Sequence, residues 1–462
     1  MTSKASKSRS TRVTPISHGA ALVRAVTRAC VRTPVSTLAA LSLAGVLLML
    51  TGLVACDLQR RTLTPTSAEF GVEPLVRIRV ERNEPSAVLS SDGPVRAWPA
   101  SMPQPDERAA LFTAPVRVAA DAGGVRVTGA AGGSARFAQG TIVRLGATSH
   151  TLAVNDVPVG PTALAMPRSD DTPDRLDVIA ELPMESYIAG VAAAELVPGW
   201  APEAYRAQAV AARSYAVHQR ARARGMKRSY DLDSTVRDQA FKGLTEDRRV
   251  IDATNDTRGI ILASGGRPLR AYYSSTCGGR AASAADVWTV GRGLEFNRPA
   301  PLQARVRDCP CQASPLYRWE RTRPLSGVAA RIAEWGKDRG HAVRALRGIR
   351  RIDVNKRNVA DRPSSYRVVD TRGKSFVLSA EELRVATNTS VRTRPGITRE
   401  TRIPAGDFEV TIRGNEATFT GRGFGHGVGM CQFGAQGLAM RGQTWIEILG
   451  RYYPGARVER QW

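Results

Sequence analysis

The sequence predicts an α+β protein in which a β-rich N-terminal part precedes a domain of mixed helix and sheet. Short runs that alternate apolar and polar residues, VRIRVE, GVRVTG, TIVRLG and HTLAVN, are typical of half-buried strands. Two helical segments follow at 184–196 and 202–225, and strand patterns return at GIILAS and PLRAYYSS. The 462 residues have room for two or three domains.

The N-terminal segment, residues 1–56, has the composition of a secretory signal. Seven basic residues and no acidic residue precede Cys56, and an uncharged apolar run extends from Thr37 to Ala55. The run ends in LVAC, which resembles the lipobox of bacterial lipoproteins and predicts lipidation of Cys56. An uncleaved membrane anchor is the alternative, because 19 apolar residues are just enough to span a bilayer. Both interpretations predict an exported, membrane-anchored protein of the bacterial cell envelope.

The formal charge of +24 does not by itself indicate nucleic-acid binding. Without the N-terminal segment, 59 basic residues remain against 42 acidic ones, and the charge falls to +17. The basic residues are scattered along the chain, and an export signal is at odds with a nucleic-acid partner. An exported basic surface fits a polyanion of the envelope better.

The remaining elements are expected in a defined order. Residues 57–72 have the polar composition of a linker, residues 73–180 form the β-rich region, and residues 181–462 form the mixed domain. Within 202–225, Pro202 suits a first helical position and Gly225 a helix end. Further on, a helix is expected near 325–339, strands near 349–355 and 365–378, and a helix opened by the capping box Thr444-x-x-Glu447.

Glycine occupies every second position from Gly421 to Gly429, with His426 between two of them. No register supplies the dinucleotide-binding fingerprint, and the Gly-Lys-Ser/Thr end of a nucleotide phosphate loop is missing. A period of two favours an extended segment with one bare face, which another backbone or a flat ligand can approach closely. A glycine-rich turn is the alternative interpretation.

Glu195 is the most informative acidic residue. It lies on the apolar face of its predicted helix and follows three alanines, where a solvated carboxylate would be out of place. Burial among apolar groups raises the pKa of a carboxyl group and makes it usable as a general acid near neutral pH. The alternative is a structural ion pair with Arg206 or Arg213 of the next helix.

Three blocks of the sequence resemble the signature blocks of the SpoIID/LytB family. They are GVAAAELVPGWAPEAYRAQAVAARSYA, AYYSSTCGGRAASAADVW, and GRGFGHGVGMCQFGAQGLAMRG with ILGRYYPGA, and YDLDSTVRDQAFKG resembles the family's connecting segment. The resemblance runs from about Leu182 to Ala456. The family includes the sporulation lytic transglycosylase SpoIID and the amidase enhancer LytB.

The resemblance implies a peptidoglycan lytic transglycosylase in which Glu195 is the catalytic acid and base. Such an enzyme needs one carboxyl group, whereas ordinary glycosidases use two. It cleaves the bond between N-acetylmuramic acid and N-acetylglucosamine and leaves a 1,6-anhydro product. The alternatives are a non-catalytic amidase enhancer that acts with a cell-wall amidase, a glycan-binding module of the same fold, and an envelope scaffold.

Residues of the second and third blocks are expected to line the groove for peptidoglycan glycan strands. Aromatic rings can stack on sugars and hydroxyl groups can bind sugar substituents, although buried core tyrosines are the simpler alternative. A structural role is also the commoner case for a histidine such as His426. The expected substrate-binding residues are Tyr272, Tyr273, Ser274, Ser275, Gly278, Gly279, His426 and Gln432.

The cysteines outside the N-terminal segment are Cys277, Cys309, Cys311 and Cys431. In an exported chain, a disulfide between Cys277 and either Cys309 or Cys311 is the default. Zinc bound by these three thiolates is the alternative, and some relatives carry a metal near the second block. Because Cys309-x-Cys311 is not the usual zinc spacing, a disulfide is favoured and no cofactor is expected. Cys431 is expected to be simply a small residue.

Overall fold

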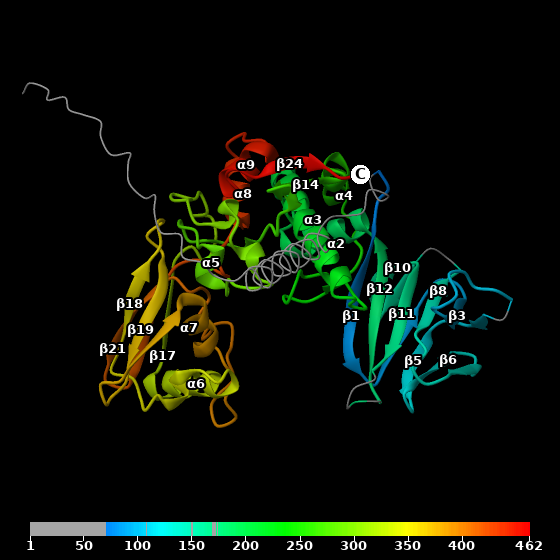
Figure 1. The fold of residues 1–462 in the computed structure, drawn as a ribbon, viewed down its shortest axis with the longest axis horizontal. Helices are drawn as coiled ribbons and strands as arrows, with labels where there is room; N and C mark the ends of the chain where they lie inside the picture. Colours follow the sequence, from blue (N-terminus) through cyan, green and yellow to red (C-terminus); the bar gives the residue numbers. More distant parts are fainter. Residues whose placement is uncertain (1–70, 108, 149–150, 169–171, 173) are drawn as a thin grey trace, which may run out of the picture. The chain divides into compact units, whose positions relative to one another are not determined.

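The computed structural model describes residues 71–462, except for residues 108, 149–150, 169–171 and 173. The predicted signal, the lipidation site Cys56 and linker residues 57–70 lie outside the described residues. Within the described part, no helix combines the length and the apolar character needed to cross a membrane. Helices and several sheets are both present, which confirms the α+β class (Figure 1).

Two sheets make up the N-terminal region. The runs VRIRVE, GVRVTG, TIVRLG and HTLAVN supply parts of β1, β6, β8 and β9, as the alternation predicts. In β5, Val116 and Val118 are buried while Arg117 between them is exposed. The strands are β1 (Leu75–Glu84), β2 (Ser86–Ser90), β3 (Val95–Pro99), β4 (Ala110–Phe112), β5 (Val116–Asp121), β6 (Gly124–Gly129), β7 (Ser134–Phe137), β8 (Val143–Ala147), β9 (Leu152–Val154), β10 (Val157–Gly160), β11 (Thr162–Pro167) and β12 (Leu176–Pro183).

The seven-stranded sheet joins the β-rich region to the domain that follows. Its order is β13-β1-β12-β11-β8-β3-β4, and the other sheet has the order β10-β9-β2-β5-β6-β7. The strand β13 (Leu232–Asp233) pairs in parallel with β1, next to an ion pair of 2.7 Å between Arg79 and Asp233. The predicted boundary between residues 180 and 181 falls inside β12. One hydrophobic core therefore runs from Val76 of β1 to Tyr453 near the C-terminus.

The helices of the mixed domain follow local sequence signals closely. Helix α3 has the predicted bounds, with Pro202 in its first turn, and α9 has both hydrogen bonds of the Thr444–Glu447 capping box. The segment PLRAYYSS contributes only two short strands. The elements are α2 (Met184–Glu195), α3 (Pro202–Gly225), α4 (Arg248–Asp256), β14 (Ile260–Ser264), β15 (Arg267–Pro268), β16 (Tyr273–Ser274), α5 (Ala284–Val287), η2 (Glu295–Asn297), η3 (Ala300–Leu302), β23 (Met430–Cys431), α8 (Gln432–Ala439), α9 (Trp445–Tyr452) and β24 (Arg457–Arg460).

Residues 319–421, from β17 to β22, have their own hydrophobic core, and we call them the inserted part. That core contains buried side chains from Trp319 to Phe419, and α6 lies where a helix is expected. Two three-stranded sheets, β17-β22-β21 and β18-β19-β20, form this part. Its elements are β17 (Trp319–Pro324), α6 (Leu325–Asp338), η4 (Ala342–Ala345), β18 (Arg351–Arg357), β19 (Pro363–Val369), β20 (Ser375–Ser379), α7 (Ala380–Thr387), β21 (Phe408–Arg413) and β22 (Glu416–Gly421).

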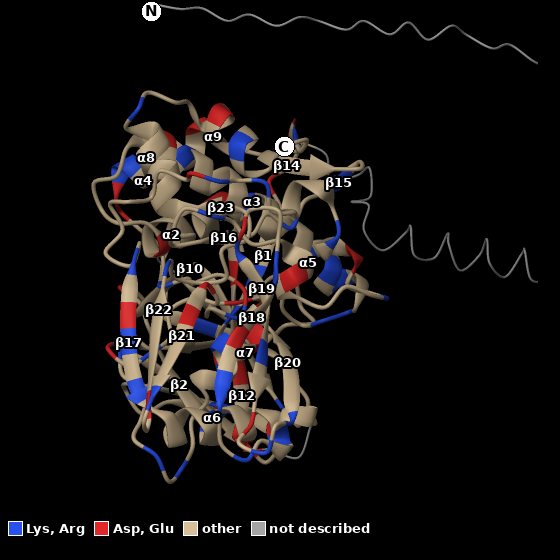
Figure 2. Cartoon of the chain, turned by 90° about the vertical axis from the view of Figure 1, so that its left-hand side faces the viewer, with Lys and Arg blue, Asp and Glu red and all other residues tan. Residues whose placement is uncertain are grey.

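Charged residues are distributed over the described elements. In Figure 2, Lys and Arg occur on β17, near α6, on α9 and around α5, with Asp and Glu among them. Many of the arginines have acidic partners, such as Asp177 and Asp233 for Arg79 and Asp407 for Arg280. This distribution agrees with the scattered basic residues of the sequence.

Candidate active site

Glu195 is the last residue of α2, and its side chain is half-buried. Its carboxylate accepts a hydrogen bond of 3.2 Å from Gln432 Nε2 and one of 3.4 Å from the backbone N–H of Ala240. Burial raises the pKa of Glu195, and these two donors together with the charge of Lys242 oppose the shift. The carboxyl group of Glu195 therefore stays protonated to a higher pH than that of an ordinary glutamate.

The two arginines that could have neutralised Glu195 have other partners. Arg213 is fully buried and forms a salt bridge of 2.5 Å with Glu185, at the opposite end of α2. Arg206 pairs with Glu203 and, at 2.7 Å, with Asp256. The structural ion-pair alternative for Glu195 is therefore wrong, because both guanidinium groups are engaged elsewhere.

Gln432 is the predicted site residue that the fold brings directly to Glu195. It begins α8, immediately after β23 pairs in parallel with β16 of the second block. Its side chain is only 3% exposed, so it cannot present its amide freely to a glycan. Gln432 holds the carboxylate in place by donating a hydrogen bond, which is a different role from the predicted substrate contact.

The tyrosines of the second block pack inside the protein. Tyr272 is buried, its ring stacks on Trp288 with centroids 4.1 Å apart, and its hydroxyl donates to Asn297 at 2.7 Å. The Tyr273 hydroxyl accepts a hydrogen bond of 2.9 Å from Gln239. Burial raises the pKa of both phenols. The core alternative therefore holds for Tyr272, because its ring has no free face for a sugar.

The other predicted residues of the second block contribute backbone geometry. Ser274 is buried in β16, and the Ser275 carbonyl accepts a hydrogen bond from Phe433 N. Gly278 and Gly279 have φ values of +69° and +103°, and a Cβ on Gly278 would lie 2.7 Å from the Arg422 side chain. These glycines shape a turn against the third block, and their substrate contact stays a prediction.

The alternating glycines let the third block lie against the second. A Cβ on Gly429 would lie 1.9 Å from the carbonyl oxygen of Tyr272, and one on Gly423 would lie 2.7 Å from that of Thr276. The approach of another backbone was the predicted reason for the bare positions. The segment is not a flat extended strand, however, because the four glycines from Gly423 to Gly429 have φ between +70° and +94°. The backbone that approaches Gly423 and Gly429 is that of the second block, whereas Gly427 faces the Arg362 side chain.

His426 has a structural environment. Its Nδ1 accepts a hydrogen bond of 3.0 Å from Val428 N, and its ring lies 5.0 Å from that of Trp288. Burial lowers the pKa of His426 to about 4, so the imidazole is neutral near pH 7. It lines a small pocket with Glu381 and Arg362, on the side of the inserted part. This agrees with the structural interpretation, and a glycan contact by His426 stays a prediction.

Comparison with known proteins finds a family domain that includes Glu195. The family profile described as Stage II sporulation protein, SpoIID, matches residues 172–263, which include Glu195 and Ala240. The chain is 26% identical over 295 residues to Stage II sporulation protein D of Bacillus subtilis, covering 61% of this chain and 75% of the relative. The chain therefore contains a SpoIID domain and is similar to the SpoIID/LytB family.

Two further relatives match a similar share of the chain. An uncharacterised protein of Brachyspira hyodysenteriae is 27% identical over 286 residues, which is 62% of this chain and 69% of the relative. The amidase enhancer of Bacillus subtilis is 26% identical over 292 residues, or 58% of this chain and 39% of the relative. A domain of unknown function, DUF8618, matches residues 301–429, and it contains the separate core between Trp319 and Phe419.

Within this SpoIID/LytB fold, three residues near the site are missing from the sequence prediction. Gln239 accepts from the Tyr187 hydroxyl at 3.2 Å and donates to the Tyr273 hydroxyl, which ties α2 to the second block. Trp200 and Phe433 form an edge-to-face pair with centroids 5.0 Å apart, and both are partly exposed. Trp200 follows Glu195 and Phe433 follows Gln432 within the first and third blocks. This closeness in the sequence is the signal that could have pointed to them.

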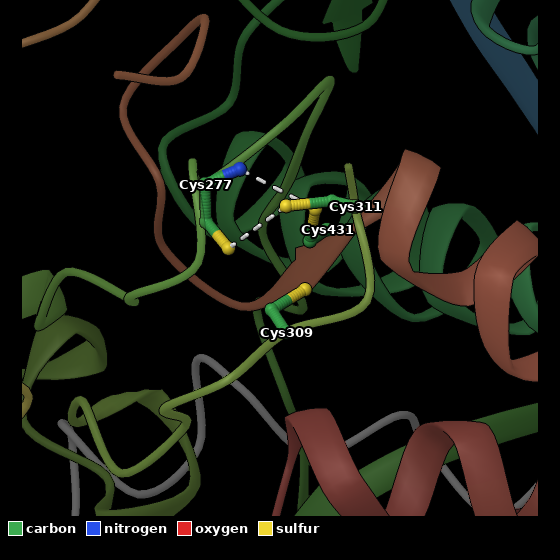
Figure 3. Close-up of side chains that lie close together, drawn as sticks. All are labelled: Cys277, Cys309, Cys311 and Cys431. Carbon is green, nitrogen blue, oxygen red and sulfur yellow. Dashed lines mark hydrogen bonds between the residues drawn. The ribbon is translucent and has the colours of Figure 1, made fainter. Parts of the chain in front are cut away.

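The four cysteines of the SpoIID/LytB domain converge in one buried cluster (Figure 3). Their sulfur atoms all lie within 4.8 Å of one another, and all four are free thiols. The favoured disulfide of Cys277 with Cys309 or Cys311 is therefore not formed. The interpretation of Cys431 as merely a small residue is also wrong, because its sulfur is the fourth member of the cluster. The spacing of the cysteines in the sequence could not predict this cluster, because Cys431 lies 154 residues from Cys277. The two come together through the pairing of β16 with β23.

Proposed function

We propose that this protein is a peptidoglycan lytic transglycosylase of the bacterial cell envelope with Glu195 as its single acid and base. The observation that carries the proposal is the state of Glu195, which is half-buried, has a raised pKa and is held by Gln432 rather than by a cation. The SpoIID domain and the similarity to the SpoIID/LytB family support a role in the cell wall.

The proposed reaction needs one carboxyl group that changes protonation state during the cycle. Protonated Glu195 gives its proton to the glycosidic oxygen as the bond from that oxygen to C1 of N-acetylmuramic acid breaks. The resulting carboxylate then takes the proton of the C6 hydroxyl of the same sugar, and O6 bonds to C1. The products are a free 4-hydroxyl group and a 1,6-anhydro end, so the proton returns to Glu195 and no water is consumed.

The surroundings of Glu195 suit both halves of this cycle. Burial favours the neutral acid, whereas the Gln432 amide and the Ala240 N–H stabilise the carboxylate that forms after the first proton transfer. The net effect is a raised pKa, which suits one group that acts in turn as acid and base. The partly exposed pair of Trp200 and Phe433, which follow Glu195 and Gln432 in the sequence, offers aromatic surface for sugar rings.

The location of the protein is part of the proposal. The signal-like segment 1–56 and its LVAC sequence support export and lipidation at Cys56, which would hold the domain beside the peptidoglycan. The similarity to the amidase enhancer of Bacillus subtilis favours a second candidate function, in which the chain stimulates a cell-wall amidase without cutting glycan.

The experiment that tests the proposal is product analysis with purified glycan strands. We expect the full-length protein to generate 1,6-anhydromuramic ends that mass spectrometry detects, because intramolecular attack by O6 replaces water. Reducing ends in their place would identify a hydrolase and contradict the transglycosylase mechanism. Stimulation of an added amidase without new glycan ends would instead support the enhancer function.

The variant Gln432→Leu is expected to shift the pH dependence of glycan cleavage to higher pH. Gln432 donates to the charged form of Glu195, so its loss raises the pKa of this carboxyl group further. The acid form then persists to higher pH, and the descending limb of kcat/KM moves up by about one pH unit, as expected for one hydrogen bond to a charged group.

The matched control for this shift is Gln443→Leu, which makes the same substitution in the turn after α8. Its profile should coincide with that of the wild type. An unchanged descending limb in Gln432→Leu would show that this limb does not report Glu195.

A further inference from the structure

The cysteine cluster is assembled from three segments that are far apart in the sequence. Cys277 follows β16, Cys309 and Cys311 belong to the loop after η3, and Cys431 ends β23. No more than 2% of any of these side chains is exposed. Thiols form only weak hydrogen bonds with one another. Hydrogen bonding alone therefore does not explain why four of them, from three segments, are buried at one place.

The spacing of the sulfur atoms fits a single bound ion better than disulfides. A disulfide requires sulfur atoms about 2.05 Å apart, whereas Cys277 Sγ and Cys311 Sγ are 3.9 Å apart. Four thiolates placed tetrahedrally around zinc at about 2.3 Å have sulfur atoms roughly 3.8 Å from one another. All four sulfur atoms lie within 4.8 Å of one another, so they are close enough together to bind one ion in this way (Figure 3).

Neighbouring groups donate hydrogen bonds to the sulfur atoms, as expected for the second shell of a thiolate site. Cys277 N and Gly434 N each donate to Cys431 Sγ at 3.3 Å. The Tyr452 hydroxyl lies 3.1 Å from Cys309 Sγ, where it can donate to a thiolate. Such donors offset the negative charge that four thiolates leave around a divalent ion.

Helix α8 is shaped to admit the loop that carries two of the cysteines. A Cβ on Gly434 would lie 2.4 Å from Cys309 Sγ, and one on Gly437 would lie 2.1 Å from the carbonyl oxygen of Pro310. Side chains at these two positions would push the Cys309-Pro310-Cys311 loop away from Cys431. The glycines of α8 thus preserve the short distances within the cluster.

We propose that Cys277, Cys309, Cys311 and Cys431 bind one Zn²⁺ ion in a closed, structural tetrahedral site. Four protein ligands leave no position for water or substrate, which distinguishes a structural zinc site from a catalytic one. Thiolate ligands in tetrahedral arrangement select zinc or iron among the common metals. The distances leave room for one ion and not for a bridged cluster of several irons.

The site joins the two signature blocks to the base of the inserted part. Cys431 is the N-cap of α8, and the next residue, Gln432, binds Glu195. Cys309 and Cys311 lie just before the separate core that begins at Trp319. Zinc would therefore fix the start of α8, and with it the amide that holds Glu195, while anchoring the inserted part to the domain.

Metal analysis of the full-length protein tests this proposal. After purification and dialysis with Zn²⁺ as the only added metal, we expect about one zinc per chain by mass spectrometry, the stoichiometry of a closed site. Cys431→Ser should lose this zinc. The control Thr322→Ser makes a similarly small change at an exposed position of β17, outside the cluster, and should keep it.

A second measurement covers the case in which Cys431→Ser does not fold. Wild-type protein stripped by a chelator and given Co²⁺ should show the intense visible bands of tetrahedral cobalt bound by thiolates, and Zn²⁺ should abolish them. Metal-free wild-type protein with disulfides between these cysteines would overturn the proposal. Stoichiometric iron, or full zinc retention in a folded Cys431→Ser, would overturn it as well.

Discussion

Glu195→Gln is expected to reduce the formation of 1,6-anhydro ends by about 10²–10⁴-fold, the usual contribution of a general acid or base. The glutamine keeps the shape of the side chain and can still accept hydrogen bonds from Gln432 and Ala240. It can neither release nor take up the proton that the reaction needs. The measurement is the initial rate at which anhydromuramic ends appear, determined by mass spectrometry.

The control for this loss is Glu246→Gln, because Glu246 is an exposed carboxylate outside the site. Its rate should equal that of the wild type. Both variants should unfold at the wild-type temperature, so that a lower rate reflects chemistry rather than stability. A Glu195→Gln protein as active as wild type would contradict the catalytic role and leave amidase stimulation as the function to pursue.

Arg213→Met is expected to lower the free energy of unfolding by about 3–5 kcal/mol, as when one partner of a buried ion pair is removed. Arg213 is fully buried and binds Glu185 through two of its nitrogen atoms. It also donates to the backbone carbonyls of Ile260 and Thr254. Methionine fills much of the space but leaves the Glu185 carboxylate without its cation. Chemical denaturation followed by tryptophan fluorescence measures the loss.

Arg206→Met is the matched control on the same helix. Arg206 pairs with Glu203 and Asp256 at the surface, where the side chain is 29% exposed, and such pairs contribute about 0–1 kcal/mol. A loss below about 1 kcal/mol for Arg213→Met would show that the buried pair does not hold α2 against α3. The helix that ends in Glu195 would then depend on apolar packing alone.

Helix ends and strand patterns could be predicted from the sequence because their causes are local. Pro202 lacks an N–H that the first turn of a helix does not need, and the Thr444–Glu447 box satisfies the free amides of its own helix. Alternating Val and Arg in β5 place one face inward whatever the partner strand is. These signals need only a few neighbouring residues, so they persist in the folded chain.

Partners across the fold could not be predicted in the same way. Arg213 was a candidate partner of Glu195, but it meets Glu185 because α2 and α3 pack with the start of α2 beside the middle of α3. Periodicity places residues on a helix face, but it does not say which turn of the next helix lies opposite. The inserted part between β17 and β22 likewise shows its separate core only once its sheets are paired.

The sequence by itself determined the resemblance to the SpoIID/LytB family and the α+β class, and it singled out Glu195 as the candidate acid, because motif order, hydrophobic period and an acid on an apolar helix face are local properties. Only the tertiary structure decided what surrounds that acid and what the cysteines form. Glu195 and Gln432 are separated by 237 residues, and Cys277 and Cys431 by 154. Both contacts, Glu195 with Gln432 and Cys277 with Cys431, depend on the pairing of β16 with β23. The glycines of the third block allow this pairing because they let the two backbones approach closely.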